Sequence, residues 1–104
     1  MDITKKIENG QVIYSLSGRL DTQSAPNFQE TLDSGFKNNE FNLIFDFKNI
    51  EYISSAGLRT VLQAQKKVNS VENGSLTLIN VTNETYDIFE LTGFTDFLNI
   101  NPEE

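Results

Sequence analysis

The chain begins with two short segments in which apolar and polar residues alternate. They cover residues 3–8 and 12–17. A period of two residues is typical of a β-strand with one buried face. Asn9-Gly10 lies between the two segments, and this dipeptide favours the positive φ angles of a tight type I′ turn. The pattern therefore predicts an N-terminal β-hairpin.

Helical spacing replaces this alternation after residue 24. The apolar residues that follow recur every three or four positions: Ala25, Phe28, Leu32 and Phe36. Such a repeat predicts an amphipathic helix. Ser24 is the expected N-cap, and Pro26 lies in the first turn, where its missing N–H costs no hydrogen bond. The helix is expected to end at Asn38-Asn39.

The rest of the chain alternates short apolar runs with helical patterns. The longest helical pattern has an inner stripe of Leu58, Val61, Leu62, Gln65 and Val68. Asn73-Gly74 is suited to end this helix in a left-handed conformation. The expected elements are a strand at 41–47, a connection at 48–53, a helix at 55–72, a strand at 76–81, a helix capped by Thr82 or Asn83 and stopped by Gly93, and a short strand or extended tail at 97–100.

The resulting order of elements is β-β-α-β-α-β-α-β. Strands that alternate with helices form parallel crossovers, so the helices are expected to pack on a mostly parallel sheet. The sequence thus predicts one small α/β domain over residues 1–104, with three main helices. Its mixed sheet has four to five strands and begins with the hairpin. An acidic tail at about 101–104 is expected to be loose.

Two missing residue types remove several classes of chemistry. The 104 residues contain no Cys and no His. Disulfide frameworks, thiol catalysis, metal sites built on Cys or His, and Ser-His-Asp hydrolysis are therefore excluded. We expect no metal, no cofactor and no catalytic residue.

The net charge of the chain is strongly negative. Fifteen Asp and Glu against eight Lys and Arg give a formal net charge of −7 and a pI near 4.4. Such a surface repels phosphate backbones, so nucleic acids and anionic membranes are poor partners. No apolar stretch approaches the ~20 residues of a membrane span, and the N-terminus lacks the apolar core of a signal peptide. We expect a soluble, cytoplasmic monomer.

Two connections in the predicted fold carry candidate functional residues. One is the segment 18–22, which follows the second strand, and the other is the segment 53–58, which opens the second helix. Function in open α/β sheets gathers outside the carboxyl ends of the parallel strands. If the two strands are parallel neighbours, Asp21 lies close to Ser54 and Ser55. Asp21 also has an ordinary interpretation, as an Asx residue that caps its own loop.

The two serines lie where a helix favours negative charge. The N-terminus of a helix presents unpaired N–H groups and a partial positive charge. A phosphorylated hydroxyl at this point adds about −1.5 to −2 charges and three acceptor oxygens. A serine before an apolar helical pattern is also an ordinary N-cap worth ~1 kcal/mol. Both roles can coexist here, with Ser54 as the cap and Ser55 as the modified residue.

Three segments of the chain carry motifs that occur together in one known family. Residues 41–62 contain Ser54-Ser55-Ala56-Gly57, residues 17–21 contain Gly-x-Leu-Asp, and residues 89–94 end in Leu-x-Gly-Phe. These segments resemble the signature segment, the turn and the last helix of the STAS domain family, and in particular of the bacterial anti-sigma factor antagonists. The three motifs occur in the right order and spacing, and together they extend the resemblance over nearly the whole chain.

The resemblance implies a partner switch. Antagonists of this family bind an anti-sigma factor that is also a serine kinase, and they displace the sigma factor that it holds. The kinase then phosphorylates the antagonist at the start of the second helix, which ends binding, and a serine phosphatase restores it. Carried over by position, the phosphoacceptor is Ser55. The implied partner-binding residues are Asp21, Ser54, Ser55, Ala56, Gly57, Leu58 and Arg59.

The sequence departs from the common family pattern on both sides of Ser55. Many members have Asp directly before the acceptor and Ser or Thr directly after it, where this chain has Ser54 and Ala56. A second branch carries Ser-Ser-Ala-Gly, as this chain does. Ser54 therefore remains the alternative acceptor. The alternative function is a STAS scaffold or interaction module of a sensory complex that is not phosphorylated. An enzyme is not expected, because the chain has no glycine-rich phosphate loop.

Overall fold

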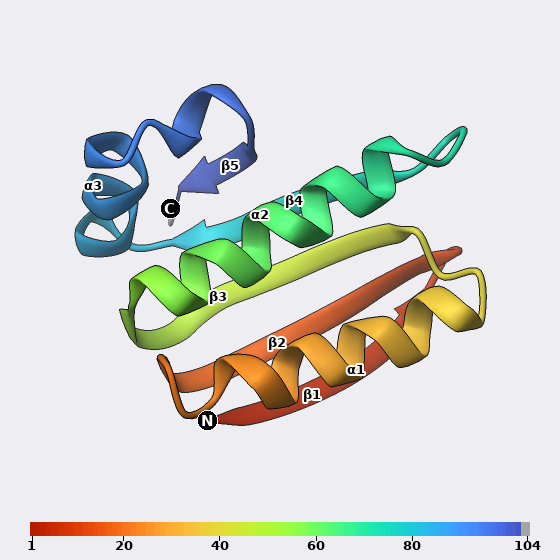
Figure 1. Ribbon diagram of the computed structural model, residues 1–104, viewed down its shortest axis with the longest axis horizontal. Helices are drawn as coiled ribbons and strands as arrows, with labels where there is room; N and C mark the ends of the chain where they lie inside the picture. The colour runs from red at the N-terminus through yellow and green to blue at the C-terminus, as the bar shows by residue number, and fades with distance from the viewer. Residues whose placement is uncertain (103–104) are drawn as a thin grey trace.

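The computed structural model describes residues 1–102 and contains a five-stranded sheet. The strands lie in chain order, with β1 antiparallel to β2 and the remaining neighbours parallel (Figure 1). This confirms the predicted mixed, mostly parallel sheet. The strands are β1 (Asp2–Glu8), β2 (Gln11–Leu20), β3 (Asn42–Ile53), β4 (Ser75–Val81) and β5 (Asn99–Pro102).

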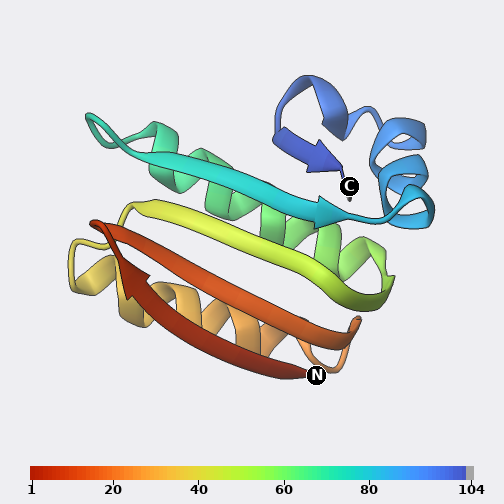
Figure 2. The same cartoon turned by 180° about the vertical axis from the view of Figure 1, so that it is seen from behind.

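Three helices complete the predicted α/β fold. The helices α1 (Ala25–Lys37) and α2 (Ser55–Asn69) lie side by side on one face of the sheet (Figure 1). Figure 2 shows the opposite face, on which neither of them lies. The third helix, α3 (Asn83–Leu91), follows β4, and the short 3₁₀ helix η1 (Phe94–Asp96) leads into β5. The N-terminal ends of all three helices therefore lie at the carboxyl edge of the parallel strands.

The core lies between the sheet and the helices that cover it. Alternate residues of β3 point into it, and its centre is an aromatic cluster of Tyr14, Phe28 and Phe45, all fully buried. Their ring centroids are 5.1–6.2 Å apart with edge-on geometry, which adds to the free energy gained by burial. Phe89 stacks on Phe47 at 6.1 Å. This contact fixes α3 against β3.

The N-terminal hairpin forms as predicted. Asn9 and Gly10 have φ angles of 54° and 80°, which match the two left-handed positions of a type I′ turn. The strands pair from Glu8 opposite Gln11 to Asp2 opposite Ser17. Because β1 runs back along β2, the start of the chain lies beside the carboxyl end of β2.

The predicted connection at 48–53 is wrong, because these residues continue β3. They pair with β2 as far as Leu20 opposite Ile53, with register shifts near Ser17 and Gly18. Ile50 and Ile53 are buried, so the longer strand extends the core. As a result, Ser54 alone connects β3 to α2.

The ends of α2 and of the C-terminal strand also differ from the prediction. The second helix ends at Asn69 rather than at residue 72, because the N–H of Val71 bonds to the carbonyl of Val68 in a tighter turn. Asn73 then has the expected left-handed conformation, with a φ angle of 67°. The tail expected to be loose is in part ordered, since β5 extends to Pro102 and pairs with β4. Residues 103–104 lie outside the described residues.

Candidate functional site

The two connections predicted to lie together do so. Leu20 and Ile53 are neighbours in the ladder between β2 and β3. The next residue of the second connection, Ser54, donates its backbone N–H to the carbonyl oxygen of Leu20 at 2.9 Å. The loop that begins at Asp21 and the start of α2 are therefore held side by side at the carboxyl edge of the sheet (Figure 1).

Gly57 permits this close approach. A Cβ atom on Gly57 would lie 2.6 Å from the carbonyl oxygen of Leu20 and 2.7 Å from its Cγ. Gly57 and Leu58 are both buried. The implied direct contact of these two residues with a partner does not fit this burial. They hold α2 in place, and Ser55 and Arg59 form the exposed surface.

The two adjacent serines have different environments. Ser54 is half-buried and has the extended conformation of an N-cap, and its Oγ accepts the N–H of Gly57 at 3.3 Å. Ser55 is the first residue of α2 and is exposed. The hydroxyl of Ser54 is thus engaged in the fold, whereas that of Ser55 faces solvent at the positive end of the helix.

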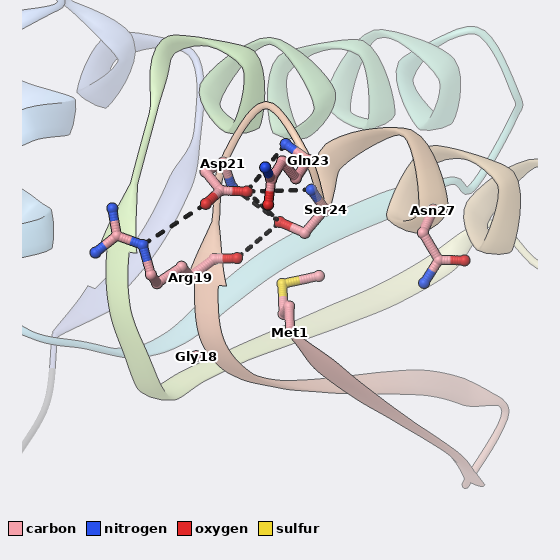
Figure 3. Close-up of a pocket in the computed structure, with 7 residues that line it drawn as sticks. All are labelled: Met1, Gly18, Arg19, Asp21, Gln23, Ser24 and Asn27. Atoms are coloured by element: carbon pink, nitrogen blue, oxygen red, sulfur yellow. Dashed lines mark hydrogen bonds and ion pairs between the residues drawn. The ribbon is translucent and has the colours of Figure 1, made fainter.

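Asp21 caps the turn that leads into α1 (Figure 3). Its Oδ1 accepts the backbone N–H groups of Gln23 at 3.0 Å and of Ser24 at 3.1 Å. Arg19 Nε lies 3.6 Å from Oδ2. Chiefly the N–H of Ser24, helped by the N–H of Gln23 and by Arg19, holds the pKa of the Asp21 carboxyl below its ordinary value. This is the Asx role that the sequence left open.

The predicted capping of α1 by the side chain of Ser24 is wrong. Ser24 is the N-cap by position, but its side chain bonds no N–H of the helix. The hydroxyl instead donates to the carbonyl oxygen of Arg19 at 2.7 Å and accepts the N–H of Asp21 at 2.9 Å. Because Asp21 already satisfies the N–H groups of this turn, the hydroxyl is free to hold the loop to the end of β2.

Arg19 also contacts β3 near its carboxyl end. Its guanidinium lies 4.4 Å from the ring centroid of Tyr52, its neighbour in the strand ladder. In Figure 3 the Arg19 side chain points away from Met1 and Asn27. Tyr52 is 41% exposed. No sequence pattern indicated a role for it, because residues 48–53 were expected to form a connection. A stacked Arg–Tyr pair is a common feature of binding surfaces.

Two concave regions flank the Asp21 loop. The larger, of about 540 Å³, lies between the start of β1 and the start of α1 (Figure 3). It is lined by Met1, Gly18, Arg19, Asp21, Gln23, Ser24 and Asn27. Met1 reaches this edge because β1 is antiparallel to β2. The hairpin that the sequence predicts pairs Asp2 with Ser17, so Met1 lies beside Gly18 at this edge.

The second region is a groove of about 260 Å³ between α1 and α2. Ala56 and Arg59 line its α2 side, and Pro26 and Gln29 line its α1 side. The complete lining is Thr22, Ala25, Pro26, Gln29, Ala56, Arg59, Thr60 and Gln63. No sequence pattern indicated the contribution of α1, because only the packing of the two helices brings it to the site.

Residues 1–102 contain neither a cluster of metal-ligating side chains nor a membrane-spanning helix. No group of three or more Asp or Glu side chains among them is placed to hold a metal ion. No helix in this part of the chain has the length and apolar character to cross a membrane.

Curated relatives and solved structures resemble this chain over most of its length. A Bordetella bronchiseptica protein that carries the name of an anti-sigma factor antagonist, BtrV, is 31% identical over 94 residues, covering 90% of this chain and 80% of the relative. An anti-sigma factor antagonist from Mycobacterium paratuberculosis has the same fold, with a TM-score of 0.88 and 19% identity over 97% of this chain and 85% of that chain.

Two further structures show the range of proteins with this fold. The phosphorylated form of the Bacillus cell fate determinant SpoIIAA matches with a TM-score of 0.75 and 18% identity, covering 95% of this chain and 90% of that one. A sulfate transporter family protein from Wolinella succinogenes matches with a TM-score of 0.78 and 19% identity, covering 93% of this chain and 80% of that one. The profile of the STAS domain matches residues 2–104, and this chain therefore belongs to the STAS domain family.

Proposed function

We propose that this protein is an anti-sigma factor antagonist that is switched by phosphorylation of Ser55. In its unphosphorylated form it binds an anti-sigma factor with serine kinase activity and so releases a sigma factor for transcription. The name of the Bordetella relative supports the class of partner. The environment of Ser55 supports the position of the switch.

The observation that carries the proposal is the division of roles between the two serines. The hydroxyl of Ser54 caps α2 through the N–H of Gly57, so its modification would cost that hydrogen bond. Ser55 is exposed at the first position of α2. Its Oγ can be modified without breaking a contact within the protein.

The proposed switch transfers one phosphoryl group in each direction. The kinase moves the γ-phosphoryl group of ATP to Ser55 Oγ, the hydroxyl proton passes to a base of the kinase, and ADP leaves. A serine phosphatase hydrolyses the phosphoester with water, which restores the hydroxyl and releases inorganic phosphate. The catalytic groups belong to these two enzymes, and this chain acts as their protein substrate.

The physical effect of the phosphate falls on the partner rather than on the fold. The N-terminus of α2 favours a dianion, and Arg59 lies one turn further along the same helix, at the i+4 position. A docked partner instead meets added volume and a charge of about −1.5 to −2 that must be desolvated. Each 1.4 kcal/mol lost weakens binding tenfold. Asp21 adds little repulsion, because Arg19 and backbone N–H groups compensate its charge.

The test is phosphorylation by candidate anti-sigma factor kinases with ATP, followed by mass spectrometry. We expect one phosphate on the wild-type protein and on the Ser54→Ala variant, and none on Ser55→Ala. Ser34→Ala is a matched control, because Ser34 is an exposed serine on α1, away from the site. Phosphate that persists on Ser55→Ala and disappears from Ser54→Ala would move the acceptor to Ser54.

A second candidate function is a STAS scaffold without a phosphorylation cycle. It is favoured by the likeness to a domain of a sulfate transporter family protein. Binding of the variant Ser55→Asp to the same kinases, measured by calorimetry, separates the two functions. The switch predicts affinity reduced by about tenfold or more. Equal affinity of Ser55→Asp and the wild type would favour the scaffold.

A further inference from the structure

The net negative charge of the chain comes from its last 37 residues. Residues 1–67 contain eight acidic and eight basic residues, so this part has no formal net charge. Residues 68–104 contain seven acidic residues and no Lys or Arg. The whole net charge of −7 therefore comes from the segment that forms β4, α3, η1 and β5.

The structure gathers much of this charge at one end of the molecule. Figures 1 and 2 both show α3, η1 and β5 together, beyond the two helices that cover the centre of the sheet. Four exposed acidic residues lie on α3 and η1: Glu84, Asp87, Glu90 and Asp96. Within residues 1–102, none of these four carboxylates takes part in an ion pair.

Two large apolar side chains are exposed in the same segment. Leu91 is 87% exposed and Phe97 is 66% exposed. Leu91 follows Asp87 by four positions and Glu84 by seven, so these three residues share one face of α3. Phe97 follows Asp96 directly, at the end of η1. We call the six residues Glu84, Asp87, Glu90, Leu91, Asp96 and Phe97 the α3 surface.

We propose that the α3 surface docks a basic, amphipathic segment of another protein. Leu91 and Phe97 supply apolar contacts, and the exposed carboxylates of the same segment favour Lys and Arg on the partner. Anionic membranes and nucleic acids are repelled by the same carboxylates. A second copy of this chain would bring like charges together at this surface. Charge complementarity therefore selects a basic protein segment among the possible occupants.

This inference is independent of the proposed switch, because the α3 surface contains no residue of the Ser55 site. Its apolar part consists of two side chains, and its charges are exposed and therefore screened by salt. We accordingly expect a weak contact that depends on ionic strength and speeds association more than it prolongs the complex. Such a contact suits a protein that must exchange partners.

The direct test uses a synthetic cationic helix as the probe. A peptide of about 18 residues, with Leu at i, i+4 and i+7 positions and Lys on the other face, is titrated into ¹⁵N-labelled full-length protein. We expect amide shift changes concentrated between residues 84 and 98, with an affinity that falls as NaCl is raised. One control peptide has Glu in place of Lys, and another has Ser in place of Leu. Shift changes spread over the whole chain, or equal binding of the Ser peptide, would overturn the proposal.

Variants of the protein, in place of variants of the peptide, test the same surface. The double variant L91S/F97S is expected to bind the Lys-Leu peptide about tenfold more weakly. Ile7→Ser is the matched control, because Ile7 is 62% exposed but lies on β1 in the neutral part of the chain. Ser55→Asp is expected to bind the peptide as the wild type does, which separates this test from that of the switch. Unchanged affinity of a folded L91S/F97S protein, with folding checked by circular dichroism, would contradict the proposal.

Discussion

The backbone N–H of Ser54 donates a 2.9 Å hydrogen bond to the carbonyl oxygen of Leu20. This bond joins the residue that ends β2 to the residue that caps α2. It places the start of α2 beside the loop that begins at Asp21, and it leaves the next residue, Ser55, exposed. The geometry of the candidate site therefore depends on how closely α2 approaches the end of β2.

Gly57→Ala tests this close approach. The added Cβ would lie 2.6 Å from the carbonyl oxygen of Leu20 and 3.0 Å from Cγ1 of Ile53. The backbone at the end of β2 cannot move away without loss of its hydrogen bonds to β3. We therefore expect the free energy of unfolding to fall by about 1–3 kcal/mol. Urea unfolding measures this loss. Ser55→Ala is the control, and equal stability of Gly57→Ala and the wild type would show that α2 is less tightly held.

Removal of either serine hydroxyl distinguishes the two roles. Ser54→Ala removes the N-cap and is expected to lower the free energy of unfolding by about 1 kcal/mol. The Ser55 hydroxyl makes no hydrogen bond within residues 1–102, so Ser55→Ala is expected to change the free energy of unfolding by less than about 0.5 kcal/mol. Thermal or urea unfolding of both variants gives the comparison. A larger loss in Ser55→Ala would mean that Ser55, and not Ser54, caps the helix.

The lowered pKa of Asp21 predicts a loss of stability in acid. The carboxylate accepts backbone N–H groups in the folded protein, so the unfolded chain takes up a proton at higher pH than the folded protein does. This contribution is present above the ordinary Asp pKa of ~3.9 and is lost as the pH falls through the lower folded value. Urea unfolding over the acid range measures it.

Asp21→Asn is the variant for that measurement. The amide oxygen can still accept both N–H groups, but it does not titrate, so the part of the acid dependence that belongs to Asp21 should disappear. Asp33→Asn, which removes an exposed carboxylate that bonds a side chain on α1, is the matched control. An acid dependence that is identical in Asp21→Asn and the wild type would contradict the assignment.

Arg59 is expected to stabilise the phosphorylated state. The phosphate on Ser55 would lie at the positive end of α2, with Arg59 four residues further along. Both features favour the dianion, so its second pKa should lie below the value of ~6 that is typical of a phosphoserine. A ³¹P NMR titration of the phosphorylated protein measures this pKa. Arg59→Gln should raise it, whereas Lys67→Gln, in the last turn of α2, should leave it unchanged.

Local sequence patterns determined much of the fold before any tertiary contact was considered. Asn9-Gly10 selects its turn through the φ angles that it tolerates. Helical spacing from Ala25 to Phe36 was sufficient to locate α1. The serine pair at the start of α2 and the crowding of acidic residues after Lys67 are likewise properties of the chain itself. These features depend on interactions within a few residues, which a linear pattern records.

Only the tertiary structure decided how the site is assembled. The extension of β3 to Ile53 depends on pairing with β2, which lies more than thirty residues earlier in the chain. That pairing stacks Arg19 on Tyr52 and brings Ser54 to Leu20. The burial of Leu58 and the groove between α1 and α2 depend on packing between distant elements. Local patterns cannot predict these features, because strand register and helix packing are set by contacts between residues that are far apart in the sequence.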